Sequence, residues 1–155
     1  IEIYPDGPDG WEWLGNVYID RADIPAALEC YRAATELGPE LFRPRHNLAA
    51  ALYYTGRPAE ALEQFAILES LHPPTASGSA IAIRALIELD LWDEATERLV
   101  HSLDRDPDSH ELFAIAAELI SQHPQPERLH TSLRDQLSLP EHTAAEAVLR
   151  PMLGP

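Results

Sequence analysis

Apolar residues recur along this chain every three or four positions, in short stretches that polar or proline-containing segments separate. This spacing gives an α-helix one apolar face and predicts helices rather than strands. The start signals agree, because Pro25, Pro44 and Pro58 stand at first-turn positions and Asp108 or Ser109 offers an N-cap. The predicted helices are 9–20, 25–37, 44–55, 58–71, 77–89, 92–104, 109–121, 125–136 and a last one over 140–150.

The same arrangement of large and small residues returns with a period of about 34 residues. In the first unit the marker residues are Trp11, Leu14, Gly15, Tyr18, Ala27, Tyr31, Ala34 and Pro39. One period later stand Arg45, Leu48, Ala49, Leu52, Ala61, Phe65, Leu68 and Pro73, and two periods later Ser79, Ala82, Ile83, Leu86, Ala95, Leu99, Ser102 and Pro107. The small markers allow two helices to approach closely and the large ones fill the seam, so each unit is predicted to be a helix pair.

These markers resemble the tetratricopeptide repeat, W-x2-L-G-x2-Y followed by A-x3-F and a proline. The first two units match it well, the third inverts Leu-Gly into Ala82-Ile83, and the fourth has Leu129 in place of the small Ala. The resemblance implies an all-α fold, a right-handed α-solenoid of antiparallel helix pairs in one domain over 1–155. Its expected parts are clear repeats at 8–41, 42–75 and 76–109, a degenerate repeat at 110–138 and a capping helix at 140–150.

The net charge of the chain limits the kinds of molecule that it can bind. Twenty-six acidic residues face eleven basic ones, all Arg, and the formal net charge is −15. Nucleic acid and anionic membrane surfaces would be repelled, so we expect a basic or neutral protein partner and a monomer or weak dimer. The sequence shows no apolar run long enough to cross a membrane and no signal-peptide pattern, which favours a cytoplasmic location. Arg without Lys is typical of GC-rich coding and suggests a bacterial origin, and the start at Ile1 suggests a fragment or a processed product.

No motif for chemistry stands out. The sequence has no nucleophile elbow, no glycine-rich phosphate loop and no metal-ligand spacing among its seven histidines. Cys30 is the single cysteine and is expected to be a small core residue. We therefore expect no enzyme activity, no catalytic residue, no metal and no cofactor.

The resemblance also implies a concave groove lined by the first helix of each pair. Its expected residues are Trp13, Asn16, Ile19, Asp20, His46, Asn47, Ala50, Tyr53, Tyr54, Ile81, Arg84, Ile87 and Glu88. In relatives that capture a C-terminal carboxylate, two Asn and three basic residues lie on this surface. Asn16 and Asn47 match, but Glu12, Ser77 and Ile81 stand at the basic positions, so such a clamp is not expected.

The favoured function is a non-catalytic module that binds a peptide or helix of a partner protein in this groove, with a basic, amphipathic segment as the ligand. A chaperone for a secreted protein, a self-associating scaffold and a regulatory domain of a larger enzyme stay open as alternatives.

Overall fold

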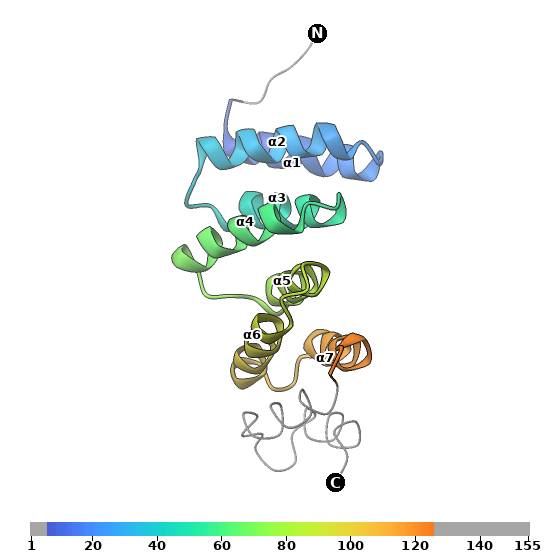
Figure 1. Cartoon of the computed structure of the whole chain (residues 1–155). Coiled ribbons are helices and arrows are strands. Elements are labelled where there is room, and N and C mark those ends of the chain that lie inside the picture. Colours follow the sequence, from blue (N-terminus) through green and yellow to red (C-terminus); the bar gives the residue numbers. More distant parts are fainter. Residues whose placement is uncertain (1–5, 126–155) are drawn as a thin grey trace. The chain divides into compact units, whose positions relative to one another are not determined.

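Helices are the only regular elements in residues 6–125, the part of the chain that the computed structural model describes (Figure 1). They are α1 (Pro8–Asp20), α2 (Ile24–Leu37), α3 (Phe42–Tyr54), α4 (Pro58–Leu71), α5 (Ala76–Glu88), α6 (Trp92–Arg105) and α7 (His110–Gln122). The all-α prediction is confirmed, and every helix end in this range lies within two residues of the predicted one. The predicted helix 140–150 and all but the first residue of the predicted helix 125–136 lie outside the described residues.

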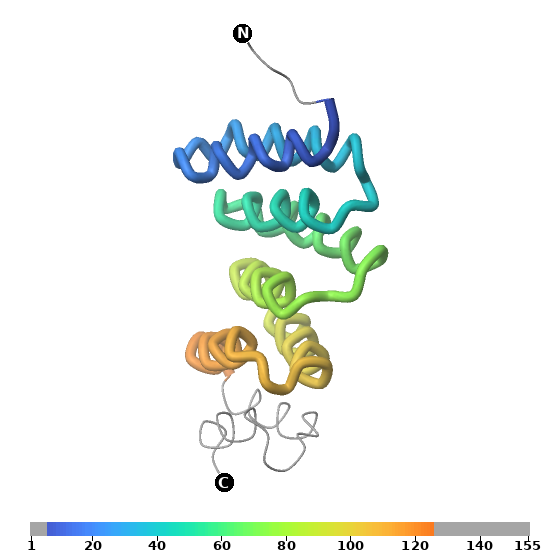
Figure 2. The backbone as a smooth tube through the Cα atoms, turned by 180° about the vertical axis from the view of Figure 1, so that it is seen from behind, coloured from blue at the N-terminus to red at the C-terminus, as the bar shows by residue number. Residues whose placement is uncertain are grey.

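The chain divides into two compact units, Ile1–Pro74 and Thr75–Pro155, at the junction predicted between the second and third repeats. In the first unit α1 packs on α2 and α3 on α4, while α2 also contacts α3 and α1 contacts α3. In the second unit α5 packs on α6 and on α7, and α6 contacts α7. Figure 2 shows the chain reversing between the two helices of each pair, so the pairs are antiparallel. That the whole chain is one domain stays a prediction.

The small marker Gly15 explains how closely α1 and α2 approach each other. A Cβ atom added to Gly15 would lie 2.5 Å from Cε1 and 2.8 Å from Cδ1 of Tyr31, which is closer than packed carbon atoms come. The Tyr31 ring thus lies directly on the α1 backbone and is only 2% exposed. The pairing of a glycine with a tyrosine one helix later is what sets this helix separation.

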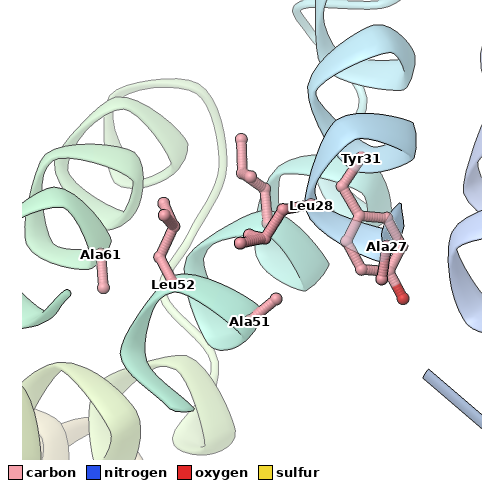
Figure 3. Close-up of a cluster of buried hydrophobic side chains, with 7 residues drawn as sticks. Ala27, Leu28, Tyr31, Ala51, Leu52 and Ala61 are labelled. Carbon is pink, nitrogen blue, oxygen red and sulfur yellow. The ribbon is translucent and has the colours of Figure 1, made fainter. Parts of the chain in front are cut away.

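The core of the first unit joins its two helix pairs. Figure 3 shows buried side chains of α2, such as Leu28 and Tyr31, near Ala51 and Leu52 of α3 and Ala61 of α4. Tyr18, Ile24 and Tyr53 pack against this cluster from its edges. Because one helix pair cannot enclose its own apolar face, this shared core is what stabilises the stacked arrangement.

The turn within each pair repeats with the same period as the helices. Ala22, Gly56 and Asp90 stand 34 residues apart and all have positive φ angles, of 59°, 73° and 59°. At each turn the N–H of the next residue donates to a carbonyl near the helix end, for example Arg57 to Leu52 at 3.0 Å. Two of the three turns therefore place a non-glycine residue in the left-handed region, where L-residues are strained.

Side-chain caps fix three helix starts in the described range. Asp23 accepts from the N–H of Ala26, Thr75 from that of Gly78 and Ser109 from that of Leu112. Of the two predicted caps for α7, Ser109 is the one that forms. Residues 77–79 lie inside the first turns of α5, directly after the cap Thr75.

Candidate functional site

Two large aromatic side chains stand out on the first helices of the two pairs in the first unit. Trp13 of α1 is 68% exposed and Tyr54, the last residue of α3, is 71% exposed. Residues 13 and 20 lie two helical turns apart on one face of α1. One period later these positions are Asn47 and Tyr54, so Trp13, Asn47 and Tyr54 lie on equivalent faces of α1 and α3, two helices that contact each other. We call these two faces together the α1/α3 surface.

Polar side chains connect α1 and α3. The Nδ2 atom of Asn47 lies 3.4 Å from Oε1 of Glu12 and 3.5 Å from Oδ1 of Asn16. The predicted pair Asn16 and Asn47 is thus brought together in the structure. Within residues 6–125, Nδ2 of Asn16 and Oδ1 of Asn47 make no hydrogen bond, which leaves one donor group and one acceptor on this surface.

Tyr31, a buried residue of α2, orients one of these two asparagines. Its hydroxyl donates to Oδ1 of Asn16 at 2.7 Å and so holds the amide oxygen in place. Burial, followed by the nearby charges of Glu12, Cys30 and Asp20, raises the pKa of Tyr31 to about 12. The phenol therefore keeps its proton at neutral pH and remains a donor to Asn16.

Glu12 is a buried carboxylate, only 5% exposed, in the same polar cluster. Besides Asn47, it faces Arg43 of α3, whose guanidinium lies 3.5 Å from Oε2. The Arg43 side chain is 74% exposed, so it approaches Glu12 from the solvent side. Arg43 is one turn before Asn47 on α3, which puts both on the same side of that helix.

The remaining predicted residues of the first unit differ in exposure. Asp20 and Ile19 are exposed at the end of α1. Tyr53 is half-buried against the core and its ring meets that of Tyr54 edge-on, with centroids 5.2 Å apart. His46 stacks on Phe42 and lies edge-on to the buried Phe65 of α4, so it packs toward its own helix pair.

In the second unit, most of the predicted groove residues are buried or paired with another side chain. Ile81 and Ile87 are 6% and 7% exposed, so neither offers apolar surface to a ligand. Arg84 donates from Nε to Glu118 of α7 at 3.0 Å, an ion pair that joins the first helices of successive repeats. Glu88, at the end of α5, is exposed.

Comparison with known proteins shows what this architecture is similar to. No protein-family model and no curated protein sequence matches the chain. Among solved structures it is similar to the first TPR domain of Spaghetti (RPAP3) bound to the HSP90 peptide SRMEEVD. That match has a TM-score of 0.66 and 16% identity, and covers 86% of this chain and 98% of that one.

Two further proteins are among the similar structures. YrrB, described as a TPR protein with an unusual peptide-binding site, has a TM-score of 0.66 and 18% identity, covering 87% of this chain and 70% of its own. MamA from Desulfovibrio magneticus RS-1, from residue 41 to its end, has a TM-score of 0.63 and 14% identity, covering 86% and 85%. The protein has a tetratricopeptide-repeat fold.

The hydrogen bonds and ion pairs involve side chains that the sequence does not mark as polar partners. From the sequence, Glu12 is expected only as a replacement for a basic residue, and Tyr31 only as a core marker. Arg43 and Glu118 are not among the expected groove residues. The period held a signal for one of them, because Glu118 stands 34 residues after Arg84 and so occupies the same place on the next first helix.

Other kinds of site leave little trace in the described range. No group of three or more His, Cys, Asp or Glu side chains that could hold a metal ion occurs in residues 6–125. None of the helices described there combines the length and the apolar character that a membrane crossing requires. Cys30 is buried, as predicted, and burial, followed by the charge of Glu29, raises the pKa of its thiol, which makes it a poor nucleophile.

A shallow hollow lies elsewhere in the first unit, between α2 and the turn that leads into α4. Its lining includes the charged side chains of Asp23, Glu29, Arg32 and Arg57. Arg32 pairs with Glu29 at 2.9 Å, and Arg57 pairs with Glu60. Both arginines of this hollow therefore already have a carboxylate partner.

Proposed function

We propose that this protein is a non-catalytic interaction module whose α1/α3 surface binds a peptide or helix of a partner protein. The observation that carries the proposal is the polar cluster of Glu12, Asn16 and Asn47 on the same two helices that carry the exposed rings of Trp13 and Tyr54. Large exposed aromatic residues beside oriented polar groups are typical of the centres of protein interfaces.

The two asparagines suit an extended peptide. The amide group of Asn16 retains its NH2 donors and that of Asn47 retains its oxygen, and a peptide backbone presents a C=O and an N–H in alternation. The structures similar to this chain add support, because the RPAP3 domain was solved with an HSP90 peptide and YrrB is described by its peptide-binding site.

The charge supports a basic, amphipathic ligand. Asp20 and Glu12 lie on α1, and the whole chain carries −15. A basic segment would be attracted over long distances, which accelerates the encounter more than it deepens the affinity. A free C-terminal carboxylate is not required of the ligand, since Glu12 would repel it. The same charge favours a monomer or weak dimer, and we propose a cytoplasmic role without nucleic acid, cofactor or metal.

Selection of displayed random peptides on the whole chain, followed by titration of a selected peptide, tests the proposal. Trp13→Ala and Tyr54→Ala should each weaken binding by about 1–3 kcal/mol, because each removes a large ring from the contact. The double variant Asn16→Ala with Asn47→Ala should also weaken it while the helical circular dichroism stays unchanged.

Matched controls lie on α4, where Ile67 is 42% exposed and Glu63 is exposed. Ile67→Ala and Glu63→Ala should leave the affinity unchanged. If these two abolish binding and the α1/α3 variants bind as the parent does, the partner surface lies on α4 and the proposal is wrong.

A further inference from the structure

Glu12 is bonded less well than a buried carboxylate usually is. A charged group out of water is stable only with close, well-oriented partners. In the described part of the chain, its two oxygens have one contact each, at 3.4 Å to Asn47 and 3.5 Å to Arg43. Both are long compared with the 2.7–2.9 Å of ordinary charge-assisted hydrogen bonds. A carboxylate accepts about four hydrogen bonds, so most of this capacity is unused.

Arg43 shows which group fits over this carboxylate. Its guanidinium approaches Glu12 from solvent, and most of its side chain is exposed. Because the Arg43 side chain is largely exposed and its contact with Glu12 is long, moving Arg43 aside costs less than breaking a close, fully buried ion pair. Another guanidinium can therefore take the same position if it makes closer contacts.

We propose that Glu12, with Asn47, binds the guanidinium group of an arginine side chain from the partner peptide, and that Arg43 occupies this place in the free protein. The inference rests on the proposed function and specifies the chemistry of its ligand. The Glu12 carboxylate takes the charge. The amide group of Asn47 contacts Glu12 through Nδ2, and its Oδ1 atom makes no hydrogen bond within residues 6–125, so it can serve as a further acceptor.

Arginine suits this place better than lysine. A guanidinium is planar, presents several N–H groups in a fixed fork and is weakly hydrated, so it matches a buried carboxylate in two contacts. An ammonium group is a compact and strongly hydrated charge that loses more on leaving water.

The probe for the test is N-acetyl-argininamide, with N-acetyl-citrullinamide as the neutral analogue of the same shape. Binding is followed on the whole chain through the side-chain amide signals of Asn16 and Asn47 in two-dimensional NMR spectra. We expect saturable shifts at these signals with a roughly millimolar dissociation constant for arginine, and none for citrulline.

Three variants locate the binding group. Glu12→Gln keeps the shape and should weaken arginine binding by about 10–100-fold, since a contact to a charged group is lost. Arg43→Ala should strengthen it by about 2–5-fold, because the internal competitor is gone. Arg32→Ala is the control, because it removes the same charge and frees Glu29 in the hollow on α2, and it should leave binding at Asn47 unchanged.

Equal shifts with citrulline, full binding by Glu12→Gln, or no saturable shift in the tens of millimolar would each overturn the inference. If Glu12→Gln fails to fold, the comparison of Arg43→Ala with Arg32→Ala still decides, because only Arg43→Ala should strengthen binding and equal affinities of the two variants would overturn the inference. The failures are distinguishable: selected peptides that bind through Trp13 and Tyr54 without needing an arginine would refute this inference and leave the proposed function standing.

Discussion

Replacing Gly15 by Ala tests the helix packing most directly. The added Cβ would lie 2.5, 2.8 and 3.1 Å from three atoms of the Tyr31 ring, which is buried and cannot move outward freely. Overpacking of this kind costs about 1–3 kcal/mol. A displaced ring would also lose its hydrogen bond to Asn16, worth about 0.5–1.5 kcal/mol. Alanine favours the helix over glycine by about 1 kcal/mol, so we expect a net loss of roughly 1–3 kcal/mol in the free energy of unfolding.

Urea denaturation followed by circular dichroism measures this loss, and the midpoint should fall by about 1 M. Two further variants separate the contributions. Asn16→Ala removes the hydrogen bond without the clash, and Gly15→Ala in a Tyr31→Leu background removes most of the clash. In that background the change to alanine should be neutral or stabilising, which is the coupling expected of residues in contact. If Gly15→Ala alone raises the midpoint, helix propensity outweighs the packing and the reasoning is wrong.

Three further predictions concern the turns, the buried phenol and a helix cap. Gly56→Ala should lower the free energy of unfolding by about 1 kcal/mol and Ala22→Gly raise it by up to about 1 kcal/mol, since both turns have positive φ; urea midpoints that move in the same direction would contradict this. The pKa of Tyr31 is about 12 in the folded protein and 10.0 ordinarily, so its contribution to stability is complete below about pH 10 and is lost as the pH rises through 12, by about 2–3 kcal/mol. Tyr31→Phe should remove that part of the pH dependence, and an unchanged curve would refute the assignment. Ser109→Ala should cost about 1 kcal/mol and Ser109→Asp almost nothing in thermal unfolding, whereas equal losses would show that the cap to Leu112 is unimportant.

The sequence was enough to predict the helices and the fold because both depend on a few spaced markers. Gly15 and Tyr31 show why: a glycine on one helix and an aromatic residue on the next are needed for the close approach that the structure contains. The turns were predicted less completely. Gly56 announces a positive φ, but Ala22 and Asp90 adopt one as well, because the packed helices on either side leave the connecting residue no other conformation.

The sequence predicted which positions lie near one another in the candidate site, but not the hydrogen bonds that their side chains make. Asn16 and Asn47 are close together, as their places in the repeat suggested. The hydrogen bond that orients Asn16, however, is donated by the hydroxyl of Tyr31, a core residue. Ile81 and Ile87 were expected to be accessible. The burial of a side chain depends on how closely neighbouring segments pack against it. The pattern of apolar and polar residues does not predict that separation.

One set of equivalent positions shows why the repeat period predicts the fold but not the function. Residues 16, 50, 84 and 118 stand 34 apart at the same place on successive first helices, and they are Asn, Ala, Arg and Glu. None of them is a packing marker, so the repeat leaves their chemistry unconstrained. In the first unit this set includes Asn16, hydrogen-bonded to the core through Tyr31. In the second it carries Arg84 paired with Glu118, which satisfies both charges within the protein. The unit whose polar groups retain free donors and acceptors is therefore the one to which we assign the ligand.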